Sequence, residues 1–197
     1  MPKEKRAIQK EDIMPLDIYI KNRKELRKSI VEFKKDRRIA LGPYATFYFE
    51  SYETMLAQVQ EMLYIEKGGE EQMKDELVAY NPLVPNGLEL TATLMFEIDN
   101  PISRAAFLSK VGGIEEKVFM KIDGEIIKAT PEEDVDRTSA DGKASSVQFI
   151  HFKLNDKQIK KFKSNSFQID LGINHNEYSH STKLSELTIK SLSQDFN

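Results

Sequence analysis

The sequence of 197 residues contains no cysteine, and this absence excludes several kinds of chemistry. Without thiols the chain cannot form a disulfide, a nucleophilic cysteine site, a zinc–thiolate site or a thiolate-held iron–sulfur cluster. Long apolar runs are also missing, since no stretch approaches the roughly 20 residues that a membrane span needs. Residues 1–10 are charged and do not resemble a secretory signal peptide. We therefore expect a cytoplasmic protein.

The sequence also lacks the short motifs of the common enzyme classes. Its nine glycines form neither the Gly-x-Ser-x-Gly elbow of serine hydrolases nor the glycine-rich loops that bind nucleotides. Adjacent acids occur at residues 115–116 and 132–134, where they are typical of solvated turns rather than of acid–base catalysis. Whether the protein is an enzyme is therefore left open, and no catalytic residue is predicted.

Charge is distributed unevenly along the chain. Residues 1–38 carry 13 basic and 7 acidic side chains, whereas residues 39–142 carry 8 basic and 20 acidic ones. A basic first helix could face nucleic-acid phosphates, but the overall pI of about 5.8 does not favour that function. The favoured interpretation is a solvated helix face that complements the acidic segment, within the chain or across a dimer. Nucleic acid and membranes are not expected partners, and homo-oligomerisation stays open.

Hydrophobic periodicity predicts an α+β fold, with a mostly antiparallel sheet and several flanking helices. Asp123-Gly124 lies between two apolar runs and gives the strongest hairpin signal, because this dipeptide supplies the positive φ angles of a two-residue turn. Residues 90–98 alternate between apolar and polar, which predicts a strand with one solvated face. We expect a disordered N-terminal arm at residues 1–10, one domain over residues 11–197, and an irregular segment at residues 81–87. Helices are predicted at 16–33, 52–67, 71–80, 101–111, 157–163 and 184–192, and strands at 44–50, 90–98, 118–122, 125–129, 147–154 and 167–173.

Histidine and carboxylate side chains gather after the last predicted strand. His175 continues the apolar parity of that strand, and Glu177 and His180 follow within five residues. His151, on another apolar strand, could converge on the same place. Imidazole nitrogen and carboxylate oxygen suit zinc or iron, so these four side chains are a candidate metal site. The alternative is that His175 is a partly buried, hydrogen-bonded residue and His180 is exposed, in which case no cofactor is expected.

A polar loop precedes the strand at residues 147–154. Its hydroxyls and cations could hold a carboxylate, a phosphate or a partner protein. The alternative is a connecting loop without a ligand. The candidate residues are Arg137, Thr138, Ser139, Asp141 and Lys143.

Several blocks of the sequence, taken together and in order, resemble an uncharacterised bacterial family, domain of unknown function 3501. The resemblance runs from about residue 12 to residue 178. It implies no known activity and therefore no catalytic residues. It does imply a genomic context with a rubrerythrin-like protein and an iron–sulfur oxidoreductase similar to heterodisulfide reductase. Asn174 and Asn176 stand where the family pattern has Asp and Pro around the late histidine, which weakens a supporting carboxylate role beside His175. The blocks are residues 39–43, 53–63, 76–87, 90–97, 136–143, 146–149 and 173–178.

Two functions follow as hypotheses. The first is a non-enzymatic accessory protein that binds a rubrerythrin-like protein or an iron–sulfur oxidoreductase in a redox or peroxide-protection system, using residues 137–143 and 81–87 as its surface. The second is a small metal-dependent or anion-binding enzyme built on the His/Glu cluster near the C-terminal strand.

Overall fold

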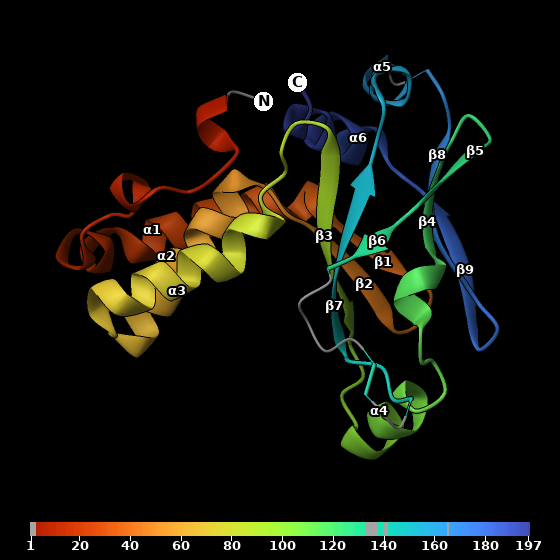
Figure 1. Cartoon of the computed structure of the whole chain (residues 1–197), viewed down its shortest axis with the longest axis horizontal. Helices are drawn as coiled ribbons and strands as arrows, with labels where there is room; N and C mark the ends of the chain where they lie inside the picture. The colour runs from red at the N-terminus through yellow and green to blue at the C-terminus, as the bar shows by residue number, and fades with distance from the viewer. Residues whose placement is uncertain (1–2, 133–137, 140–141, 165) are drawn as a thin grey trace.

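The computed structural model describes residues 3–132, 138–139, 142–164 and 166–197. These residues form helices and two antiparallel sheets (Figure 1), which confirms the predicted α+β fold. The first sheet has the order β1-β2-β3-β7-β6, with β1 at Arg38–Leu41, β2 at Ala45–Phe49, β3 at Glu89–Phe96, β7 at Val147–Lys153 and β6 at Thr130–Pro131. The second has the order β5-β4-β8-β9, with β5 at Glu125–Lys128, β4 at Val118–Ile122, β8 at Ile169–His175 and β9 at Tyr178–Lys183.

Three helices project sideways from the sheets (Figure 1). These are α1 (Leu16–Lys34), α2 (Tyr52–Glu66) and α3 (Gly69–Tyr80), and we call them the helical lobe. In the lobe α2 packs against both α1 and α3. The two sheets form the body with the remaining helices, which are α4 (Pro101–Leu108), α5 (Asp156–Ser164) and α6 (Glu186–Leu192). Within the described residues, no helix is both long enough and apolar enough to cross a membrane.

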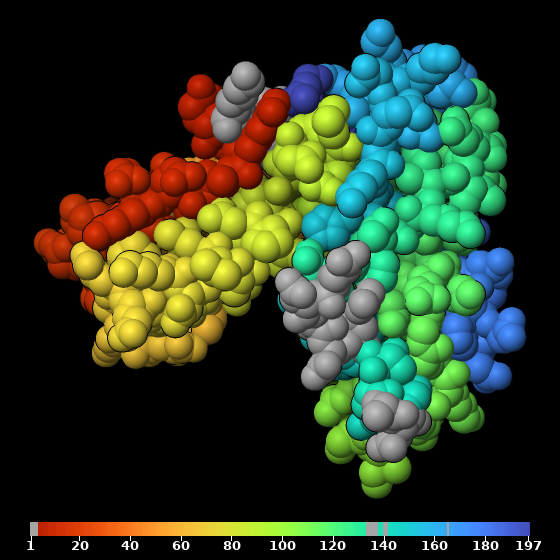
Figure 2. Space-filling view, in the orientation of Figure 1, coloured from red at the N-terminus to blue at the C-terminus, as the bar shows by residue number. Residues whose placement is uncertain are grey.

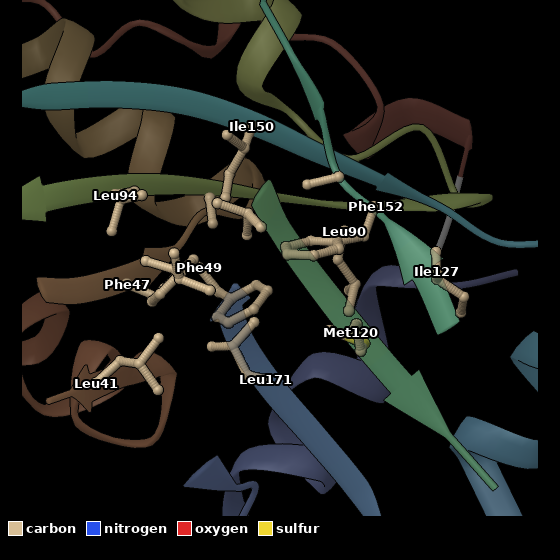
Figure 3. Close-up of a cluster of buried hydrophobic side chains, with 14 of the residues drawn as sticks. Leu41, Phe47, Phe49, Leu90, Leu94, Met120, Ile127, Ile150, Phe152 and Leu171 are labelled. Atoms are coloured by element: carbon tan, nitrogen blue, oxygen red, sulfur yellow. The ribbon is translucent and has the colours of Figure 1, made fainter. Parts of the chain in front are cut away.

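The main core lies between the two sheets (Figure 3). Alternate residues of β2, β3 and β7 point into it from the first sheet, and residues of β4, β5 and β8 meet them from the second. Its labelled members are Leu41, Phe47, Phe49, Leu90, Leu94, Met120, Ile127, Ile150, Phe152 and Leu171. A second apolar cluster joins the lobe to the body and contains Ile8, Tyr52, Met55, Val59, Leu63, Leu83 and Val84.

Local sequence signals explain where several elements begin and turn. The Ser51 hydroxyl accepts a hydrogen bond from the Thr54 N–H, and the Thr54 hydroxyl accepts one from the Ser51 N–H, so this pair caps α2. The Asn100 side chain caps α4 by accepting hydrogen bonds from the N–H groups of Ile102 and Ser103. Asp123 and Gly124 have φ angles of 52° and 81°, which confirms the predicted two-residue hairpin turn.

Three short or polar strands were not predicted from the sequence. β1 and β6 have four and two residues, which is too short for a periodic signal. β9 contains only one buried residue and is otherwise Ser, His, Thr and Lys. Its pairing with β8 comes from backbone hydrogen bonds and not from an apolar face. The segment predicted as a turn after the last strand is therefore a β8–β9 hairpin.

The prediction of a solvated face on β3 is wrong over the first half of the strand. Thr91 is fully buried, and its hydroxyl donates to the Leu83 carbonyl oxygen at 2.5 Å. The segment after α3 therefore covers this face. That segment, expected to be irregular, begins with one 3-10 turn at Asn81–Leu83.

The described part of the N-terminal segment contacts the segment after α3. Ile8 is 1% exposed, and its N–H donates to the Asn81 side chain at 2.7 Å. These contacts concern Ile8, and the disordered arm expected over residues 1–10 stays a prediction. The apolar residues of α1 recur at helical spacing, which predicts one shared face, but only Tyr19 among them is buried. These apolar residues are Leu16, Tyr19, Ile20, Leu26, Ile30 and Phe33.

Candidate functional site

The β8–β9 hairpin brings two of the predicted metal-ligating residues to one hollow. Glu177 and His180 line a hollow of about 490 Å³ together with Lys110 of the segment after α4. The His180 ring lies 4.5 Å from the Tyr178 ring, edge to face. His175 is at the end of β8, and its Nδ1 accepts a hydrogen bond from the Glu177 N–H at 3.1 Å.

Tyr178, between these residues, connects the hairpin to the other sheet. Its buried hydroxyl donates to the Leu41 carbonyl oxygen and accepts from the N–H groups of Tyr44 and Ala45 at 3.1 and 3.0 Å. Burial raises the pKa of this hydroxyl, and the two backbone donors oppose that rise. Tyr178 therefore fastens the β1–β2 turn to β9.

The structure places His151 in the other sheet, in the middle of β7. It faces Thr91 of β3 and Thr130 of β6 in the strand register. It does not line the hollow of Glu177 and His180. Among the described residues, no group of three or more histidines and carboxylates is arranged to hold a metal ion. The metal hypothesis for His151, His175, Glu177 and His180 stays a prediction.

His151 instead belongs to a chain of four hydrogen-bonded side chains. Asn86 Nδ2 donates to Glu89 Oε1 at 2.6 Å, and Glu89 Oε2 lies 3.3 Å from His151 Nδ1. His151 Nε2 lies 2.8 Å from Glu132 Oε2. The side chains of Glu89 and His151 are 8% and 11% exposed, whereas that of Glu132 is 25% exposed. This series of hydrogen-bonded side chains therefore begins at Asn86, in the loop before β3, and ends at the partly exposed carboxylate of Glu132.

These four hydrogen-bonded side chains line a hollow of about 450 Å³, where the end of α3 approaches the first sheet. We call it the junction hollow, and Figure 2 shows how the molecule bends between the lobe and the body. Lys153, at the end of β7, supplies an exposed cation to its lining. The lining residues are Pro82, Asn86, Glu89, Thr130, Pro131, Glu132, His151 and Lys153.

Stability should depend on the protonation of His151. Burial opposes its charged form, but the hydrogen bonds to Glu89 and Glu132 prevail and raise the pKa of His151. A raised folded-state pKa contributes stability that is fully present below the unfolded-state pKa, about 6.5, and is lost as pH rises through the folded value. In His151→Gln, the loss in free energy of unfolding relative to the wild type should be largest near pH 6 and should shrink towards pH 9. Urea denaturation across this range measures it, and a pH-independent difference would contradict the prediction.

The predicted anion-binding loop is only partly within the described residues, because Arg137 and Asp141 lie outside them. The Thr138 hydroxyl donates to Glu115 Oε1 and accepts from the Gly113 N–H, both at 3.2 Å. The Ser139 N–H donates to the Lys143 carbonyl oxygen at 2.8 Å. The Thr138 bonds connect the loop to the segment after α4, and the Ser139 bond connects two described residues of the loop with each other. Whether the loop binds an anion or a partner stays a prediction.

Sequence reasoning missed the partners of His151. It assigned Glu132 and Glu115 to solvated acidic turns, but Glu132 binds His151 and Glu115 is 5% exposed. Glu89 received no role. A usable signal existed in the ionisable residues Glu89 and His151, which stand next to the apolar core residues Leu90, Ile150 and Phe152, because buried polar groups need partners.

Comparisons with known proteins agree with the resemblance in the sequence. Residues 7–196 match the model of a family described as "Protein of unknown function (DUF3501)". A crystal structure of a novel protein of unknown function from Burkholderia pseudomallei K96243 is similar, with a TM-score of 0.90 and 32% sequence identity. The match covers 97% of this chain and 100% of that one. No curated protein matched the chain.

Proposed function

The chain belongs to the DUF3501 family of proteins of unknown function, and we propose that it is a non-enzymatic accessory protein that binds a partner protein at the junction hollow. One observation carries the proposal: a buried chain of hydrogen bonds holds the Glu132 carboxylate in place at a hollow between the lobe and the body. The chemistry of that carboxylate suits a basic side chain of the partner.

The polar groups of the hollow favour binding over catalysis. Both ring nitrogens of His151 lie against carboxylates, and Glu89 uses its two oxygens on His151 and Asn86. A histidine whose two nitrogens are already engaged has no free nitrogen with which to take a substrate proton. Glu132 Oε1, in contrast, accepts no hydrogen bond from the described residues. A carboxylate fixed in advance loses little conformational entropy when it binds an arginine or lysine.

The partner in this proposal is a rubrerythrin-like protein or an iron–sulfur oxidoreductase. The sequence resemblance implies that both proteins are encoded near members of this family. The chain has no cysteine for disulfide exchange or cluster binding, so its part in a redox or peroxide-protection system would be to bind and position a redox protein.

Affinity purification of the tagged protein from its native host, with mass spectrometry of the co-eluting proteins, tests this function. We expect one of the two redox proteins to co-elute near stoichiometry with the wild type. Glu132→Lys should reduce its yield about tenfold, which corresponds to about 1.4 kcal/mol of binding free energy. Glu116→Lys is the matched control, because Glu116 is exposed and forms no ion pair with the described residues. Equal yields from Glu132→Lys and wild type would refute the role of the hollow.

Lys153 provides a second variant that leaves the buried network intact. Its side chain is exposed at the hollow and makes no hydrogen bond or ion pair with the described residues. If the partner inserts a basic side chain, Lys153→Glu removes a repulsive charge and should increase the yield. A decrease would mean that the partner presents an acidic group there.

An anion-binding enzyme is the second candidate, favoured by one observation. Glu177 and His180 share their hollow with Ser103 and Lys110, so a hydroxyl, a cation and a titratable pair face one space. Calorimetry with inorganic phosphate, and elemental analysis of protein purified without chelator, test this candidate. Phosphate binding or an equivalent of metal that disappears in His180→Ala would support it. The absence of both would eliminate it.

A further inference from the structure

The longest helix of the lobe is largely uncovered. α1 has 19 residues and one buried side chain, Tyr19. Ile20 is 52% exposed and Val31 is 60% exposed. Both line an open hollow on α1 with Lys24, Lys28 and Tyr64. An amphipathic helix normally buries its apolar stripe, so this face of α1 is suited to a further protein surface.

Two of the cations on this face, Lys24 and Lys28, have no acidic partner within the described part of the chain. Lys24 and Lys28 are exposed and form no ion pair with the described residues, whereas the neighbouring Arg23 is bound to Glu61 at 2.8 Å. Lys24, Lys28 and Val31 follow one another at i, i+4 and i+7. They therefore form a stripe along one side of the helix, with two cations followed by an apolar residue.

α3 carries the complementary stripe. Glu71, Asp75 and Val78 are exposed and also stand at i, i+4 and i+7. Val78 is 76% exposed, and neither Glu71 nor Asp75 forms an ion pair with the described residues. As a whole, α1 carries six basic and three acidic residues, and α3 carries four acidic and one basic. The α1 stripe thus presents two unpaired cations, and the α3 stripe presents two carboxylates that could pair with them.

The two stripes do not neutralise each other within one chain. Both helices pack against α2, and no ion pair joins α1 to α3 among the described residues. They can meet only between two molecules. We propose that a second copy of this chain covers α1 by laying its α3 along it, with Lys24 and Lys28 against Glu71 and Asp75 and with Val31 against Val78. A two-fold axis makes the same contact twice, once for each α1.

This surface is separate from the junction hollow, so the two proposals succeed or fail independently. The dimer contact uses exposed faces of α1 and α3. The hollow uses the loop before β3, the strand β7 and Glu132. Variants at one surface leave the residues of the other unchanged.

Charge reversal tests the contact, because two reversed variants should restore the dimer when mixed, whereas two merely destabilised variants should not. The wild type should have twice the 22.7 kDa mass of one chain by light scattering at micromolar concentration, and the dimer should weaken as salt is raised. Lys24→Glu/Lys28→Glu and Glu71→Lys/Asp75→Lys should each be monomeric, because like charges then face each other in both contacts. An equimolar mixture of these two variants should form the dimer again.

The matched control is Lys157→Glu/Lys160→Glu on α5, where both lysines are exposed and form no ion pair with the described residues. This variant should stay dimeric, and circular dichroism should show unchanged helix content in every variant. A monomeric wild type would overturn the proposal. Reversed variants that stay dimeric, or a mixture that stays monomeric, would overturn it as well.

Discussion

Replacing Arg37 with methionine should cost about 3–5 kcal/mol of folding free energy, the loss typical of a buried ion pair broken on one side. Arg37 is 1% exposed although it is charged. Its guanidinium donates to the carbonyl oxygens of Phe49 and Glu50 at 3.0 and 2.6 Å and to the Asp195 carboxylate. These bonds join the end of β2 to the C-terminal segment after α6.

The pH dependence of this loss is also predicted. Burial raises the pKa of Asp195 to about 6, against the opposing attraction of Arg37. Removing Arg37 raises that pKa further, because the remaining carboxylate has lost its nearby cation. A raised carboxyl pKa favours the folded state while the group is protonated, and this contribution is lost as pH rises through the folded-state pKa. The cost of Arg37→Met should therefore be larger at pH 8 than at pH 5.

Urea denaturation of two further variants makes the result interpretable. Arg38→Met is the matched control, because Arg38 is 57% exposed and its ion pair with Glu97 at 3.3 Å is on the surface. It should cost less than about 1 kcal/mol. Asp195→Asn removes the buried carboxylate charge, but the Arg37 cation keeps the carbonyl oxygens of Phe49 and Glu50 and an amide oxygen as acceptors, so this variant should cost less than Arg37→Met. Equal losses at Arg37 and Arg38 would show that the buried pair is unimportant.

Tyr178→Phe should cost about 2–3 kcal/mol, at roughly 1 kcal/mol for each of three hydrogen bonds. The substitution removes one oxygen and keeps the ring. It leaves the Leu41 carbonyl oxygen and the N–H groups of Tyr44 and Ala45 without the hydroxyl that joins the two sheets. Buried backbone groups left without a partner are costly because water does not replace the lost bond.

Tyr44→Phe is the control for this loss. Tyr44 packs in the same aromatic cluster but is 41% exposed, and its hydroxyl makes no hydrogen bond to the described residues. Its removal should change the free energy of unfolding by less than about 0.5 kcal/mol. Thermal denaturation of both variants at one pH compares them directly. Similar melting temperatures for Tyr178→Phe and the wild type would contradict the role of the hydroxyl.

Local signals in the sequence predicted the parts of the fold that depend on local chemistry. Asp123-Gly124 determines its own turn, and the helix predicted over residues 52–67 coincides with α2 at Tyr52–Glu66. The family resemblance also rests on the order of residues along the chain, and the match of the family model to residues 7–196 confirms it.

Contacts between distant segments were not predictable in this manner. Helical spacing showed which residues of α1 share a face, but spacing does not reveal whether another element covers that face. β9 escaped prediction because backbone pairing holds it, and its side chains are mostly polar and exposed. At the candidate site, His151 was identified by its residue type. Its partners Glu89 and Glu132 come from segments that only the folded sheet brings together.

The most direct test of the central claim is the amount of redox protein that co-purifies with the wild type and with Glu132→Lys. The account predicts a rubrerythrin-like protein or an iron–sulfur oxidoreductase near stoichiometry with the wild type, and about a tenfold lower yield with the variant. A wild-type bait that elutes without either protein, or an equal yield from Glu132→Lys, would contradict it.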